Sequence, residues 1–122
     1  MKTSIVFILL LTACAIVLDE DISQEELILL SPGDSISTKT DSISFWWQRL
    51  DGAYEYEFRL VSPTFDEALH VYADSITPEN TLSLQLEAGD FQWAVRAKNG
   101  GYATDFFSRT FTILPDTTKG SE

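Results

Sequence analysis

The sequence predicts an all-β domain, an antiparallel sandwich of seven short strands, and three observations predict it. Apolar and polar residues alternate with a period of two rather than 3.6, as in strands that bury one face. The alternating stretches are short and follow one another without a helical segment. Turn-forming residues separate them at regular intervals. These turns are Asp51-Gly52, Ser62-Pro63, Thr77-Pro78, Ala88-Gly89 and Asn99 to Gly101.

The seven strands are predicted in order along the chain. The first, Leu27 to Leu30, is an apolar run that the turn Ser31 to Asp34 ends. The fourth, Ala68 to Ala73, contains the only histidine, His70. Burial of their apolar side chains contributes about 1.5–3 kcal/mol each, so a core can form without a disulfide. The other five strands have apolar residues at every second position: Ile43, Phe45 and Trp47; Tyr54, Tyr56, Phe58 and Leu60; Leu82, Leu84 and Leu86; Phe91, Trp93, Val95 and Ala97; Phe111 and Ile113.

The start of the chain combines a basic residue, an apolar run and a cysteine. Lys2 precedes an uninterrupted apolar run, Ile5 to Leu11, and the sequence Leu-Thr-Ala-Cys ends at Cys14. This ending resembles a lipobox, which implies cleavage between Ala13 and Cys14 and lipid on the thiol and on the new amino terminus. A generic secretory signal peptide is one alternative. A transmembrane helix is another, but the apolar stretch is shorter than the roughly 20 residues that cross a bilayer.

Four segments follow from this interpretation. Residues 1–13 are the signal peptide, 14–26 the lipidated cysteine with an acidic tether, 27–114 the domain and 115–122 a polar, frayed tail. The tether is rich in acidic residues and lacks aromatics, so we expect it to be solvated. Cys14 is the only cysteine, and its lipidation leaves no thiol for a disulfide.

The charge of the chain is strongly negative. Eight lysine and arginine residues face nineteen acidic ones, a formal net charge of −11. Cleavage after residue 13 of 122 removes Lys2 and leaves 109 residues with a charge of about −12. This balance argues against nucleic acid as a partner, because binding it requires cations. It also argues against electrostatic adhesion to anionic lipid head groups.

Two segments carry a family resemblance. Trp47, Ala53 and Tyr56 have the spacing of a core tryptophan, a small residue and an aromatic residue in fibronectin type III domains. The segment from Leu86 to Ala97 is similar to a later part of that family, with its leucine, glycine, aromatic and small residues in order. The resemblance implies an immunoglobulin-like sandwich over residues 27–114. Phe91 replaces the usual corner tyrosine, so the hydrogen bond of that tyrosine to the backbone is not expected.

The combination of lipobox, acidic patch and sandwich resembles small lipoproteins of Bacteroidetes. The resemblance implies the bacterial outer membrane as location. It leaves the cell surface and the periplasmic face both open, because Asp19 to Asp21 begins later than the usual export signal. Ser35, Ser75 and Thr117 follow aspartates and are similar to O-glycosylation acceptors of that group. The alternative is that each is an ordinary turn before a strand.

Enzyme signatures are absent, so we expect no catalysis, cofactor or metal. His70 is the sole histidine, and an exposed strand position explains it better than a catalytic triad does. No cluster of zinc ligands is visible. Asp19 to Asp21 is explained better by a bare acidic tether than by a calcium site. Glu55 and Glu57 share a strand face with Arg59 and are expected on a solvated surface.

Three aromatic residues are candidates for a ligand or partner face: Trp46, Tyr72 and Tyr102. Trp46 shares its strand face with polar residues, so its side chain is expected to point out of the sandwich. Such a ring can anchor a partner or stack on a sugar; the alternative is that it covers the sheet edge. We therefore expect a lipid-anchored binding or scaffolding module of the cell envelope. The alternative is a carbohydrate-binding accessory lipoprotein, and a small hydrolase is a more distant third.

Overall fold

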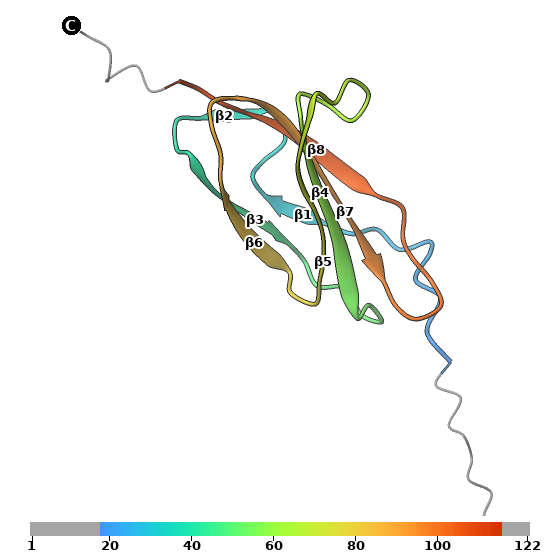
Figure 1. The fold of residues 1–122 in the computed structure, drawn as a ribbon. Coiled ribbons are helices and arrows are strands. Elements are labelled where there is room, and N and C mark those ends of the chain that lie inside the picture. Colours follow the sequence, from blue (N-terminus) through green and yellow to red (C-terminus); the bar gives the residue numbers. More distant parts are fainter. Residues whose placement is uncertain (1–17, 116–122) are drawn as a thin grey trace, which may run out of the picture.

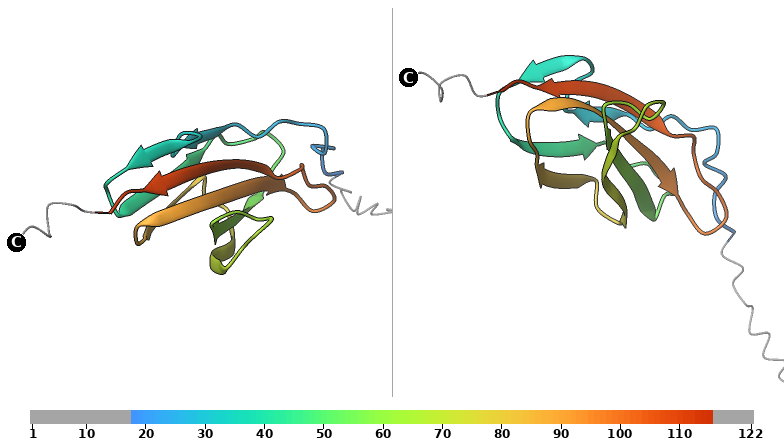
Figure 2. Two further views of the ribbon diagram at one scale, coloured as in Figure 1. Left: turned by 90° about the horizontal axis from the view of Figure 1, so that it is seen from above. Right: turned by 45° about the horizontal axis from the view of Figure 1, so that its top comes forward.

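The computed structural model describes residues 18–115, which form two β-sheets packed face to face (Figures 1 and 2). Ala13, Cys14 and Thr117 lie outside these residues, as does most of the predicted tail. The three-stranded sheet has the order β1 (Leu29–Ser31), β3 (Ser42–Trp47), β6 (Thr81–Gln85). The five-stranded sheet has the order β2 (Ile36–Thr38), β8 (Phe107–Ile113), β7 (Gly89–Lys98), β4 (Glu55–Ser62), β5 (His70–Thr77).

The sandwich has eight strands rather than the seven expected, and one pairing is parallel. The additional strand, β2, runs parallel to β8, with Ile36 opposite Phe111. The turn before it is held by the Ser35 amide, which donates to the Thr110 carbonyl at 2.7 Å. A three-residue strand is too short to show alternation, and Ile36 is exposed, so neither the strand nor its direction has a sequence signal.

The core is a cluster of aromatic rings between the sheets. Phe45, Trp47, Phe58 and Trp93 are all fully buried. The centroid of the Phe45 ring lies 4.9 Å from that of Phe58 and 5.2 Å from that of Trp93, in edge-to-face geometry. The predicted inward faces of β3, β4 and β7 are therefore confirmed at these positions. Tyr54 is an exception: it precedes β4 and is exposed.

The segment before β1 packs on the domain, although it is expected to be a solvated tether. Ile22 is fully buried and belongs to the core. The Asn99 side chain donates to the Glu20 carbonyl at 2.7 Å, and the Tyr54 hydroxyl donates to Asp19 at 2.6 Å. The acidic composition gave the wrong expectation here because one apolar residue, supported by side-chain hydrogen bonds, is enough to fix the segment.

A tyrosine hydroxyl fixes the turn before β4, whereas a phenylalanine occupies the corner position at which a tyrosine is usual. The Tyr56 hydroxyl accepts a hydrogen bond from the Leu50 amide at 2.9 Å and ties the turn before β4 to the strand. Phe91 has no hydroxyl, and its ring instead stacks on Phe111 at 5.2 Å and 15°. Packing thus replaces the hydrogen bond at the corner of β7.

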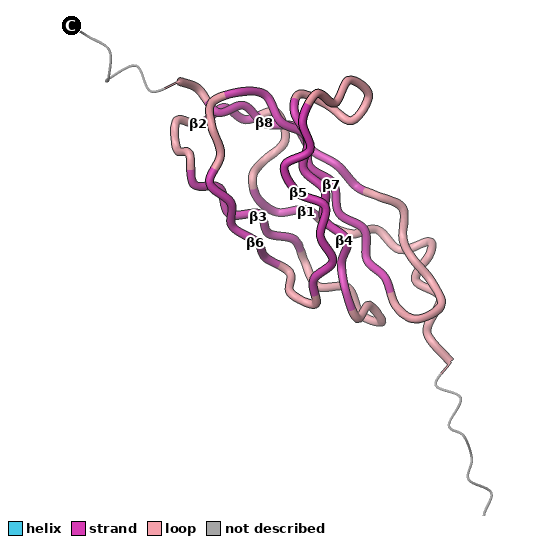
Figure 3. Tube along the Cα trace, in the orientation of Figure 1, coloured by secondary structure: helices cyan, strands magenta, loops and turns pink. Residues whose placement is uncertain are grey.

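The described chain begins and ends at opposite ends of the sandwich, and the loop between β4 and β5 projects from the side (Figures 1 and 3). Among residues 18–115, no helix is long and apolar enough to cross a membrane.

Candidate functional site

The free edge of β5 exposes the largest group of apolar side chains on one strand. β5 pairs with β4 on one side only and ends the five-stranded sheet. We define the β5 edge surface as Val71, Tyr72 and Ile76 of β5 together with Leu69, which directly precedes the strand. Leu69 is 78%, Val71 68% and Ile76 57% exposed. Single exposed apolar residues are ordinary, but several of them along a strand with one free edge mark an interaction surface.

The edge surface is held in place from the inside. The Tyr72 ring packs edge-on against the buried Phe91, with ring centroids 5.3 Å apart. His70 lies next along the strand, with its ring 6.1 Å from that of Tyr72. The register of β5 shifts between Leu60 and Val61 of β4. Because a bulge redirects side chains, it accounts for Val71 and Tyr72 both being exposed.

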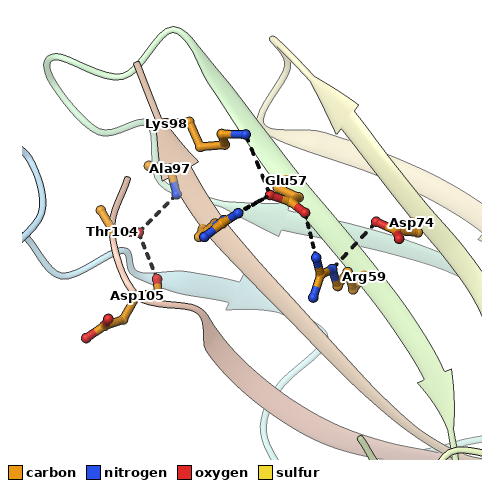
Figure 4. A network of polar contacts seen from close by, with 8 residues as sticks. Glu57, Arg59, Asp74, Ala97, Lys98, Thr104 and Asp105 are labelled. Atoms are coloured by element: carbon orange, nitrogen blue, oxygen red, sulfur yellow. Dashed lines mark hydrogen bonds and ion pairs between the residues drawn. The ribbon is translucent and has the colours of Figure 1, made fainter. Parts of the chain in front are cut away.

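A buried carboxylate lies beside this edge, on the outer face of the same sheet (Figure 4). Glu57 is 8% exposed, although its strand position predicts a solvated side chain. It accepts hydrogen bonds from Arg59 at 2.8 Å and from Arg96 at 2.9 Å, and Lys98 lies 3.8 Å away. Neighbouring strands bring these cations together, which the sequence of β4 alone does not reveal.

Burial alone would raise the pKa of Glu57. The hydrogen bonds from Arg96 and Arg59 and their charges outweigh burial, so the pKa lies below its ordinary value. A carboxylate held ionised in this way has no proton to donate near neutral pH. Its arrangement serves to join β4 to β7, and it lacks the features of a general acid.

Phe106 covers this ionic group. Its ring centroid lies 4.7 Å from the guanidinium carbons of both Arg59 and Arg96. A shallow hollow lies beside it, with Ala94 and Phe65 in its lining. Two polar side chains of the hollow have protein partners: the Gln92 carbonyl oxygen accepts from the Phe65 amide at 2.9 Å, and the Gln92 amide nitrogen donates to the Ser108 hydroxyl at 3.2 Å. The Nε of Arg59, which also lines the hollow, is buried without a hydrogen-bond partner among the described residues.

The three predicted aromatic residues lie on three separate parts of the molecule. Trp46 is on the outer face of the three-stranded sheet and is 50% exposed, as its parity predicts. Its strand face is polar, with the Ser44 and Ser83 hydroxyls 3.0 Å apart. Tyr72 is on β5 of the other sheet, and Tyr102 is in the loop after β7. They do not form one platform.

The remaining candidate residues are dispersed. Ser35 is exposed in a turn, with a φ of 60°, and Ser75 is partly buried in β5. Glycosylation of these residues stays a prediction. Asp19 and Asp21 accept hydrogen bonds from Tyr54 and Ser23, respectively.

The hydrogen bonds of Asp21 and Tyr54 shift the pKa values of these two groups in opposite directions. The hydrogen bond from Ser23 lowers the pKa of Asp21, whereas bonding to Asp19 raises the pKa of the Tyr54 phenol. Within residues 18–115 no group of three histidine, cysteine or acidic side chains is placed to hold a metal ion.

Comparison with known proteins gives a fold. No family model matches the chain, and no curated protein matches it. Among solved structures, the fibronectin(III)-like modules of Clostridium thermocellum CbhA match 74% of this chain and 98% of theirs, at 10% identity and a TM-score of 0.54. The fn3 domain of human collagen alpha-1(XX) chain matches 82% of this chain and 96% of its own, at 16% identity and a TM-score of 0.56.

A third solved structure agrees with these two. The fibronectin type III domain derived from human KIAA0970 protein matches 79% of this chain and 76% of its own, at 13% identity and a TM-score of 0.54. Identities this low carry the fold and nothing about ligands. The chain therefore has a fibronectin type III-like, immunoglobulin-like β-sandwich.

Proposed function

We propose that this protein is a lipid-anchored, non-catalytic binding module of the bacterial cell envelope, held at the outer membrane through Cys14. Its β5 edge surface pairs with an extended segment of a partner protein. The observation that carries the binding role is the group of exposed apolar side chains along an edge strand that has one free side. The lipobox-like sequence before Cys14 supports the anchor.

β5 has the two features that binding by strand addition requires, free backbone groups and exposed side chains. Its free backbone groups can form a ladder with an added strand, and its side chains can select the partner sequence. Edge strands of monomeric proteins usually carry lysine or proline that discourages pairing. The eight residues from His70 to Thr77 contain neither.

The charges near the edge indicate the chemistry of the partner. Asp66, Glu67 and Asp74 lie on or just before β5, and Asp74 is 3.6 Å from Arg59. The whole chain is strongly acidic. A partner strand that combines apolar with basic residues would match both the exposed side chains and this charge.

The binding role is tested by a charge placed on the edge. Ile76→Lys should leave the free energy of unfolding within about 0.5 kcal/mol of wild type, because the side chain is exposed. It should abolish the partner crosslink formed by a photo-reactive amino acid at position 71. Gln85→Lys, on the exposed face of β6, is the matched control and should retain the crosslink. Equal crosslinking by the two variants contradicts the role of β5.

The anchor is tested separately. Cys14→Ala should lose acylation, read by the mass of the N-terminal peptide, and should move from the detergent phase to the aqueous phase. Unchanged partitioning contradicts the lipoprotein assignment. A single acyl chain binds a membrane only marginally and reversibly, whereas two or more chains hold a protein there stably.

A second candidate function is carbohydrate binding through Trp46. The half-exposed indole beside the Ser44 and Ser83 hydroxyls supports it, because sugars bind to an aromatic face flanked by polar groups. The separation of Trp46, Tyr72 and Tyr102 weighs against an extended sugar platform. A glycan array probed with residues 15–122, with Trp46→Ala as control, decides this. Absence of binding to any glycan excludes it.

A further inference from the structure

One end of the sandwich holds the chain where it comes from the predicted anchor. The side chains of Tyr54 and Asn99 bind Asp19 and the Glu20 carbonyl at 2.6 and 2.7 Å. Ile22, three residues after Asp19, is fully buried in the core. The chain is thus attached to the domain from Asp19 onward.

The loop that receives this segment is itself held in place. In the loop 99–105, the Asn99 side-chain oxygen accepts from the amides of Gly101 and Tyr102 at 3.0 and 2.8 Å. The Thr104 hydroxyl accepts from the Ala97 amide at 3.0 Å (Figure 4). A Cβ at Gly100 would collide with the Asp19 carboxylate, so residue 19 lies directly against this loop.

The distance from this end to the proposed lipid is short. Four residues, 15–18, separate Cys14 from Asp19, and a fully extended chain advances at most about 3.6 Å per residue. All four are apolar, and Leu18 is 84% exposed. Apolar residues next to a lipid anchor partition into the bilayer interface rather than into water.

We propose that the end of the sandwich formed by Leu18, the turn before β4 and the loop 99–105 rests on the interface of the bilayer that holds the acyl chains. The proposal depends on the lipidation of Cys14 put forward above. It fixes the orientation of the domain: the turn between β6 and β7, at the other end of the ten-residue strand β7, points away from the membrane.

The side chains at this end indicate the kind of lipid surface. Tyr54 and Tyr102 are exposed there, and tyrosine is favoured at the boundary between lipid and water. Glu20, Asp21 and Asp51 are exposed near them. Negative charge near an anionic leaflet is repelled, so the end suits a zwitterionic surface.

The test measures depth at the two ends of β7. The lipidated full chain is reconstituted in phosphatidylcholine vesicles that contain a nitroxide-labelled lipid. Because acylation blocks the thiol of Cys14, a fluorophore can be attached to a single new cysteine, Gly101→Cys or Ala88→Cys. Both positions are exposed, and a Cβ at Gly101 meets its nearest neighbour, in Asp19, at 3.8 Å. We expect quenching at position 101 to be at least threefold stronger than at position 88.

The outcomes separate this proposal from the anchoring proposal. Equal quenching at the two positions, with acylation confirmed by mass, overturns the orientation and leaves the anchor intact. A chain without acylation overturns the anchor and, with it, the orientation.

A second variant tests the attachment of the segment itself. Asn99→Asp combined with Tyr54→Phe removes the donors to Asp19 and to the carbonyls of Glu20 and Gly52. It keeps the oxygen that accepts from the amides of Gly101 and Tyr102. The quenching ratio should fall toward one while the buried tryptophans keep their folded fluorescence. A ratio that stays at the wild-type value overturns the role of these contacts.

The preference for a zwitterionic surface is tested with vesicles that contain phosphatidylglycerol. Quenching at position 101 should fall in them, and added salt should restore it. Quenching that does not depend on lipid charge overturns this preference.

Discussion

The burial of Ile22 can be tested by truncating its side chain. Ile22→Ala removes three carbon atoms from a fully buried position in the core. At about 0.8 kcal/mol per buried carbon group, the transfer term is about 2.4 kcal/mol. The cavity left behind adds to it, and such truncations destabilise by about 2–5 kcal/mol. We therefore expect a loss of about 3 kcal/mol in the free energy of unfolding.

Tryptophan fluorescence during urea unfolding measures this loss. Trp47 and Trp93 are fully buried and become solvated when the domain unfolds. For a domain of this size, the same loss lowers the Tm by roughly 12 °C. Leu18→Ala is the matched control, because Leu18 lies in the same segment and is largely exposed. It should change stability by less than about 0.5 kcal/mol.

The reasoning is refuted if Ile22→Ala and Leu18→Ala are equally stable. That result would mean that the segment before β1 contributes nothing to the core. The domain would then begin at residue 27, where the apolar run Leu27 to Leu30 predicts its first strand.

Three further predictions concern single contacts. Glu57→Gln should destabilise by about 1–3 kcal/mol at pH 7, because it weakens charged hydrogen bonds. Since pairing lowers the pKa of Glu57 from its ordinary 4.5, the stabilisation is present above that pH and is lost as the pH falls through the folded-state value. Urea unfolding at pH 7 and pH 3 should show the difference between the two proteins shrinking in acid. Tyr56→Phe should cost about 1 kcal/mol, because the Leu50 amide loses its acceptor; an unchanged urea midpoint would show that water replaces it. Gly52→Ala should destabilise by about 1–3 kcal/mol, because φ is +88° and the new Cβ would meet the Glu20 side chain, whereas Gly101→Ala should be neutral in the same assay.

The parts of the fold that follow from local pattern could be predicted from the sequence. Phe45 and Trp47 face the core because they occupy alternate positions of one strand, and Trp46 between them faces outward. Alternation is a property of a single strand and needs no knowledge of its neighbours. The direction of the side chains in β3 and β7 could therefore be predicted from the sequence.

The parts that depend on long-range pairing could not be predicted. β2 owes its existence to β8, about 70 residues later in the chain, and Glu57 is buried by cations that include Arg96 of the neighbouring strand. Ile22 is apolar in an acidic segment, and its burial depends on loops far away in sequence. The average composition of the segment before β1 therefore does not reveal that one of its residues is buried.

The β5 edge surface could be predicted from the sequence only in part, because it too depends on long-range strand pairing. Tyr72 is recognisable as an exposed strand aromatic, but its neighbours Val71 and Ile76 become a surface only because β5 ends its sheet. Position at a sheet edge is set by the order of strands, which a single sequence does not state.

The antiparallel ladder between β7 and β8 has a mechanical consequence. Its register pairs run without a break from Gly89 opposite Ile113 to Val95 opposite Phe107. The chain enters at one end of the sandwich and leaves at the other, directly after β8 (Figure 1). Tension between the two ends would therefore act along β8, across ladder hydrogen bonds that lie perpendicular to it. Such bonds bear a load together rather than opening one at a time, so the domain should resist stretching along its length.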